Sequence, residues 1–220
     1  MADTQIFEPD GRAIPYAAEG QGPALVLIAG KGLNIDYLGL LSHSVSEEDF
    51  RVVRVGSRRP VSDATGSVSM KDVAQDVIDV MDHLGVRDAW VGGHAFGGSI
   101  ARVVALDHHD RVNGVLLLGV EGAEPSPDAS VEVPAHARDA EVEELQTAAW
   151  EAPAPLAEGL PVLVVQGTDD HITPAANGTA LQAAAPDRVS VVPVDGGGYL
   201  FPFTHMGATS WAIEDYLDWD

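Results

Sequence analysis

The chain contains no cysteine, which excludes disulfide bridges, thiolate metal sites and a cysteine nucleophile together. It also lacks any apolar run close to the roughly 18–20 residues that a membrane-spanning helix requires. Its first residues carry Asp3 and Glu8 and lack the basic and apolar regions of a secretory signal peptide. We therefore expect a cytoplasmic protein with no membrane partner.

Basic residues are scarce as well. Twelve lysines and arginines stand against 34 aspartates and glutamates, a formal net charge of −22. After Arg111 only Arg138 and Arg188 are positive. Such a negative field repels phosphate backbones, so we expect no nucleic-acid partner. The simplest interpretation of the charge is a solvated surface that keeps the protein in solution.

The 220 residues have the composition of one folded domain, with 45% hydrophobic and 21% charged residues. Short apolar runs alternate with segments of helical periodicity, which predicts an α/β fold with a mostly parallel sheet and helices on both faces. An N-terminal hairpin is expected over 4–7 and 12–18, and further strands over 25–29, 51–55, 89–92, 115–118, 162–165 and 189–194. Helices are expected over 73–84, 99–106, 175–184 and 211–217.

One acidic segment interrupts this alternation. Residues 121–160 hold ten acidic residues and one basic residue, and only 141–150 has the pattern of a helix. A long irregular insertion after a core strand is usually functional or disordered. We therefore expect a reduced acidic lid over a site, within a single domain that spans 1–220.

A glycine-rich segment with the sequence Gly-His-Ala-Phe-Gly-Gly, residues 93–98, follows a short apolar strand and precedes a helix. Small residues there permit a sharp strand-to-helix turn, as in a nucleophile elbow. Three further segments, 29–32, 167–174 and 196–202, follow other expected strands. On these four segments the chain resembles the α/β-hydrolase fold superfamily. The resemblance covers nearly the whole chain and implies an α/β-hydrolase fold.

The resemblance places Ala95 at the nucleophile position and Asp170 at the acid position. Tyr199 falls at the histidine position, unless the register shifts by one and Gly198 fills it. A methyl group cannot attack a carbonyl, so no serine-type acyl-enzyme step is expected. Ala95 is either a natural departure or an engineered replacement, and the missing histidine favours the natural one. The chain thus looks like a divergent branch that retains neither the serine nor the histidine of the triad.

Groups for acid/base chemistry remain around the expected site. The backbone N–H groups of Phe96 and of the loop Gly30, Lys31 and Gly32 can stabilise an oxyanion or an enolate. Glu121 lies at the end of a core strand, where the resemblance implies an alternative acid. The other candidates for proton transfer are Asp170, His205, His94 and Tyr199.

Each candidate also has a structural interpretation. His94 is typical of a packed histidine, and Asp170 of a residue that caps the following helix. Tyr199 can form an apolar wall, and His205 can lie on the surface. Lys31 is able to attract an anionic group, but a solvated lysine is the simpler interpretation.

Three functions remain open at this point. The first is an enzyme of hydrolase fold that acts on a small, largely apolar molecule by general acid/base catalysis, as a lyase, isomerase, cyclase or water-activating hydrolase. The second is a ligand-binding pseudoenzyme, and the third is a serine hydrolase whose nucleophile has been replaced by Ala95. Metal-ligand spacings and complete nucleotide-binding motifs are missing from the sequence, so we expect no metal and no cofactor. No oligomeric state follows from the sequence.

Overall fold

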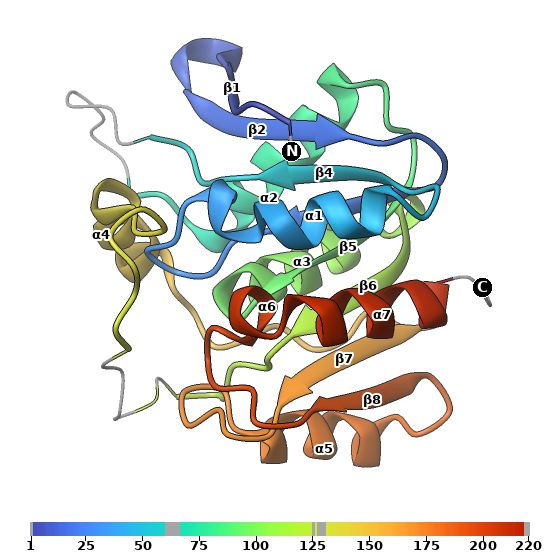
Figure 1. Cartoon of the computed structure of the whole chain (residues 1–220). Helices are drawn as coiled ribbons and strands as arrows, with labels where there is room; N and C mark the ends of the chain where they lie inside the picture. The colour runs from blue at the N-terminus through green and yellow to red at the C-terminus, as the bar shows by residue number, and fades with distance from the viewer. Residues whose placement is uncertain (1, 60–66, 125, 127–130, 218–220) are drawn as a thin grey trace.

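The computed structural model describes residues 2–59, 67–124, 126 and 131–217 (Figure 1). Its strands form one eight-stranded sheet: β1 (Gln5–Phe7), β2 (Ile14–Glu19), β3 (Ala24–Ile28), β4 (Arg51–Val55), β5 (Ala89–His94), β6 (Val112–Leu118), β7 (Val162–Gly167) and β8 (Val189–Val194). They lie in the order β1-β2-β4-β3-β5-β6-β7-β8. β2 pairs antiparallel with β1 and β4, and the other pairs are parallel.

Helices cover both faces of this sheet. The helices are α1 (Gly39–Ser46), α2 (Met70–His83), α3 (Phe96–Asp107), α4 (Ala140–Ala149), α5 (Ala175–Ala184), α6 (Phe201–Thr204) and α7 (Met206–Leu217). Side chains of α2, α3 and α5 pack into the core on one face, and side chains of α1, α6 and α7 into the core on the other. α4 lies apart from both layers, off the carboxyl ends of the parallel strands (Figure 1). Among the described residues, no helix is long and apolar enough to cross a membrane.

The predicted α/β fold is confirmed, because the central strands are buried on both faces as their continuous apolar sequences require. Every residue of β5 and of β7 is buried. β4 and β8 have the predicted bounds, whereas β5 extends two residues further and β6 begins three residues earlier. α2 begins at a capping box, in which Ser69 and Asp72 each bond the backbone of the other.

Helix α1 and the short 3-10 turn before it, Ile35–Leu38, were not predicted. The buried side chains of Leu38, Leu41 and Val45 recur there at spacings of three and four residues. This helical period is present in the sequence. Polar residues between them, and an irregular start at the turn, conceal the pattern.

Candidate functional site

The strand-to-helix turn at Ala95 has the geometry that the sequence predicts for an elbow. Ala95 adopts φ 48° and ψ −106° between β5 and α3, a strained conformation that costs an L-residue about 1–3 kcal/mol. Its amide donates a 3.0 Å hydrogen bond to the carbonyl of Leu118. A Cβ on Gly93 or Gly97 would overlap the carbonyl oxygen of Ile28, so the turn requires glycine at both positions.

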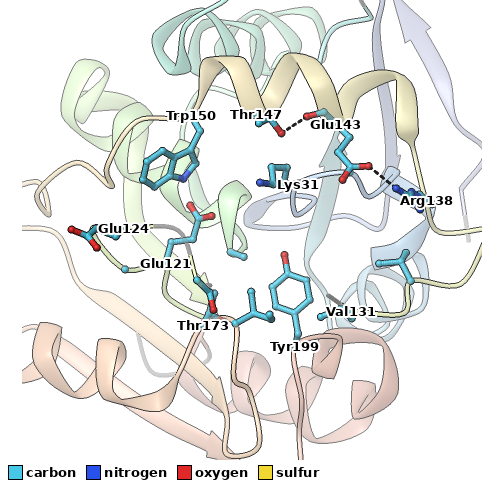
Figure 2. Close-up of a pocket in the computed structure, with 16 residues that line it drawn as sticks. Lys31, Glu121, Glu124, Val131, Arg138, Glu143, Thr147, Trp150, Thr173 and Tyr199 are labelled. Atoms are coloured by element: carbon cyan, nitrogen blue, oxygen red, sulfur yellow. Dashed lines mark hydrogen bonds and ion pairs between the residues drawn. The ribbon is translucent and has the colours of Figure 1, made fainter. Parts of the chain in front are cut away.

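Ala95 is one of the residues that line a cavity of about 290 Å³, part of whose wall is drawn in Figure 2. The loop after β3 contributes Lys31 and Gly32 to its wall, and the chain after β6 contributes Glu121. Tyr199, after β8, lines the opposite side. The insertion supplies much of the remaining wall, including Arg138, Glu143, Thr147 and Trp150 (Figure 2), and the loop after β7 adds Ile172 and Thr173.

Glu121 is the carboxyl group of the cavity that is best placed for proton transfer. Its Oε2 accepts a 2.6 Å hydrogen bond from the hydroxyl of Ser99, and the side chain of Trp150 bonds the same carboxyl group. Burial raises the pKa of Glu121, and the two hydrogen bonds and the positive charges of Lys31 and Arg102 oppose this rise only in part. A carboxyl group of raised pKa is protonated at a higher pH than an ordinary glutamate, and its ionised form is a stronger base.

The phenol of Tyr199 points into the cavity (Figure 2). Burial raises its pKa, and the nearby charges of Glu121 and Asp170 raise it further. Tyr199 is therefore a neutral hydrogen-bond donor near pH 7. Its ring packs against the imidazole of His94, with 4.5 Å between ring centroids.

His94 has no exposed surface and does not line the cavity. Burial lowers its pKa to about 4, an effect that the backbone of Tyr199 partly offsets. The imidazole is therefore neutral near pH 7 and forms the packing layer behind Ala95 and Tyr199.

The carboxylate of Asp170 is engaged by its own loop. Oδ1 accepts hydrogen bonds from the amides of Ile172 (2.8 Å) and Thr173 (2.9 Å), and Oδ2 accepts the hydroxyl of Thr173. The sequence-based alternative that Asp170 caps α5 is wrong, because the N-cap of that helix is Pro174 and no side chain caps it. Asp170 instead fixes the turn that presents Ile172 and Thr173 to the cavity.

His205 lies at the end of α6, outside the residues that line the cavity. Its Nδ1 is 2.9 Å from the hydroxyl of Thr204. Within the described part of the chain, no hydrogen bond or ion pair joins His205 to Asp170. The structure therefore does not bring these two candidates together.

The loop of Gly30, Lys31 and Gly32 passes between the elbow and the insertion. A Cβ on Gly30 would lie 2.8 Å from Nδ1 of His94, so glycine is required where the loop crosses that ring. Phe96 buries its ring completely in the core, and neither Phe96 nor Gly30 is among the residues that line the cavity.

The insertion is attached to this loop by hydrogen bonds. The amide of Asp139 donates to the carbonyl of Gly32 (2.7 Å), and the amide of Asn34 donates to the carbonyl of Ala137 (2.9 Å). Arg59, on the loop after β4, forms an ion pair with Asp139 at 2.6 Å. These contacts hold α4 over the cavity.

The site thus combines residues predicted from the sequence with residues that were not. Ala95, Lys31, Gly32, Glu121 and Tyr199 line the cavity as expected. Ser99 was not predicted, although it lies four residues after Ala95. This spacing places the two residues on the same side of α3. The insertion residues that were not predicted to line the cavity include Arg138, Glu143, Thr147 and Trp150, and the last three lie within the helix predicted over 141–150.

Comparisons with known proteins agree with this architecture. Residues 49–142 match the family model described as the alpha/beta hydrolase fold. A 53-residue segment is 44% identical to a protein of Caulobacter segnis that bears the provisional name carbamate hydrolase RutD. This match covers 24% of the chain and only 20% of that relative's length.

Solved structures resemble the chain over nearly its whole length. A thermophilic esterase from Thermogutta terrifontis, solved with malate bound, has a TM-score of 0.80 at 20% identity, with 99% of this chain and 98% of that one covered. The enol-lactonase from Burkholderia xenovorans LB400 has a TM-score of 0.81 at 19% identity, with 97% and 100% covered. The family match spans less than half of the chain, and these solved structures, at 19–20% identity, show that the chain has an α/β-hydrolase fold.

Proposed function

We propose that the protein is an enzyme that acts on a small carbonyl compound by acid/base catalysis through Glu121 and Tyr199, without an acyl-enzyme intermediate. One observation carries the proposal. At the elbow, where a nucleophile would stand, the cavity has the methyl group of Ala95, whereas a carboxyl group of raised pKa and a neutral phenol point into the same space (Figure 2).

In the proposed reaction the substrate carbonyl lies above Ala95. Its oxygen accepts hydrogen bonds from the hydroxyl of Tyr199 and from the backbone N–H of Phe96, which stabilise the charge that develops on it. Ionised Glu121 takes a proton from the carbon beside the carbonyl, and the electron pair of the broken C–H bond moves to the oxygen as an enolate. Protonated Glu121 then returns the proton to another atom of the substrate, which completes an isomerisation, elimination or ring closure. Glu121 can instead take a proton from water, which then adds to the carbonyl carbon.

The surrounding residues have supporting roles in this proposal. The described part of residues 121–160 acts as a lid that excludes water from the cavity, while residues 125 and 127–130 of the predicted lid lie outside the described residues. Asp170 shapes the wall rather than orienting a histidine. The names of the related proteins support carbonyl chemistry, since an esterase, a lactonase and a carbamate hydrolase all act at a carbonyl carbon.

Hydrogen–deuterium exchange on the substrate tests the proposed proton abstraction, and it does so without knowledge of the final product. The native protein is incubated in D₂O with small ketones and oxo acids, and deuterium entering at the carbon beside the carbonyl is followed by NMR. We expect exchange above the buffer rate, and its loss in Glu121→Gln. Glu144→Gln, an exposed change on the insertion helix, is the matched control and should leave exchange unchanged. Equal exchange by the native protein and Glu121→Gln would contradict the proposal.

A second candidate is a protein that binds the same class of compound without converting it. The engaged carboxylate of Asp170 and the position of His205 outside the cavity favour it, since neither supplies a histidine–carboxylate pair. Saturable binding with no exchange over long incubation would support this candidate.

A further inference from the structure

The two lysines of the chain have different surroundings. Lys71 lies on the surface with its Nζ 3.3 Å from a carboxylate oxygen of Asp107. Lys31 is exposed as well, but it lines the cavity (Figure 2), and no ion pair or side-chain hydrogen bond joins it to another described residue. Its ammonium group therefore faces the space that a ligand would occupy.

Two of the three carboxylates that line the same cavity have partners other than Lys31. Oε2 of Glu143 is 3.0 Å from Arg138, which also lines the cavity. Glu121 accepts hydrogen bonds from Ser99 and Trp150 and has a raised pKa, a rise that the positive charge of Lys31 opposes through space. The charge of Lys31 is therefore not neutralised by a direct ion pair within the site.

The charge of the whole chain makes this position informative. A protein with a net charge of −22 repels anions over most of its surface. A lysine without an ion-pair partner inside the cavity gives one local point at which a carboxylate is attracted. A phosphate dianion would meet the nearby charges of Glu124 and Glu143, so a single negative charge is the better match.

We propose that the ligand of this cavity is a small oxo acid whose carboxylate binds the ammonium group of Lys31, with its carbonyl directed to Ala95 and Tyr199. The cavity of about 290 Å³ suits a small molecule of this kind. The position of the carbonyl rests on the proposed function, whereas the recognition of the carboxylate by Lys31 does not.

A matched pair of probes tests this recognition in the full-length protein. Levulinate carries a ketone and a carboxylate, and its methyl ester carries the ketone without the charge. Binding of each is measured by calorimetry and by ligand-observed NMR. We expect levulinate to bind the native protein at least about tenfold more tightly than the ester, since a charge-assisted contact contributes about that factor.

Lysine variants assign the effect to one residue. Lys31→Met should reduce levulinate affinity about tenfold and leave the affinity for the ester unchanged, whereas Lys31→Arg should retain most of the binding. Lys71→Met is the control and should bind as the native protein does. Equal affinities for the acid and the ester, unchanged binding by Lys31→Met, or no saturable binding of levulinate or related short oxo acids would each overturn the proposal.

The two proposals fail in different ways. Binding of levulinate through Lys31 without deuterium exchange would support this inference and contradict the proposed catalysis. Deuterium exchange into neutral ketones, together with equal affinities for levulinate and its ester, would support the proposed catalysis and contradict the role of Lys31.

Discussion

The amide of Gly32 donates a 2.7 Å hydrogen bond to Oε1 of Gln146, which lies 114 residues further along the chain. Nε2 of the same glutamine donates a 2.7 Å hydrogen bond to the hydroxyl of Ser57. Gln146 is only 2% exposed, so both bonds are shielded from water. One side chain of the insertion helix thereby fixes the loop that carries Lys31.

Replacing this glutamine should loosen the loop and the insertion together. In Gln146→Leu the amide of Gly32 and the hydroxyl of Ser57 lose their buried partner, and each such loss costs about 1–3 kcal/mol. We expect a lower melting temperature and faster hydrogen exchange at the amide of Gly32. Gln75→Leu, at an exposed position of α2, is the control for the change of residue type. Unchanged exchange at Gly32 in Gln146→Leu would show that the hydrogen bond does not fix the loop.

Restoring a hydroxyl at the elbow should not restore a serine hydrolase. Ala95→Ser retains the strained turn, but no described histidine lines the cavity to accept the serine proton. We expect the variant to fold and to remain unlabelled by a serine-reactive fluorophosphonate, as measured by intact-protein mass spectrometry. Stoichiometric labelling would instead favour the interpretation that Ala95 replaces a catalytic serine.

The raised pKa of Glu121 predicts a stability change with pH. Because the folded state holds this proton more strongly than the unfolded state, Glu121 costs stability as the pH rises through and above its ordinary pKa. Glu121→Gln does not titrate, so its melting temperature relative to the native protein should increase between pH 4 and pH 8. A constant difference between the melting temperatures of the two proteins across this pH range would contradict a raised pKa of Glu121.

The lowered pKa of His94 predicts the opposite dependence of stability on pH. Its pKa is about 4 in the folded protein, so the unfolded chain binds the proton first as the pH falls from about 6.5 to about 4. The native protein should lose stability across this window, and His94→Gln should lose less. Chemical unfolding at several pH values measures the difference. An equal loss in both proteins would mean that the imidazole is not kept neutral by burial.

Part of this fold was predictable because the determining interactions are local. Continuous apolar runs define the buried strands, and the glycines of residues 93–98 predict the elbow because any side chain at Gly93 or Gly97 would overlap β3. Glu121 was predicted because it follows a core strand at the position where the resemblance implies an alternative acid, and it lines the cavity.

The remainder of the site depends on contacts between distant segments. Nothing in the sequence near Gln146 indicates that it bonds Gly32 and Ser57. The pairing of Arg59 with Asp139 and the lining residues of α4 follow from the same docking of the insertion. The role of Asp170 could not be predicted from the sequence either, because its hydrogen bonds with Thr173 depend on the conformation of the loop.

The pH dependence of solvent exchange tests the role of Glu121 in proton transfer most directly. The rate of deuterium entry into levulinate is measured between pH 4 and pH 9 for the native protein and for Glu121→Gln. We expect the native rate to rise with pH and to level off above a midpoint higher than the ordinary pKa of a glutamate, and we expect this rise to be missing in the variant. The same pH profile in both proteins, or no exchange by either, would contradict acid/base catalysis by Glu121.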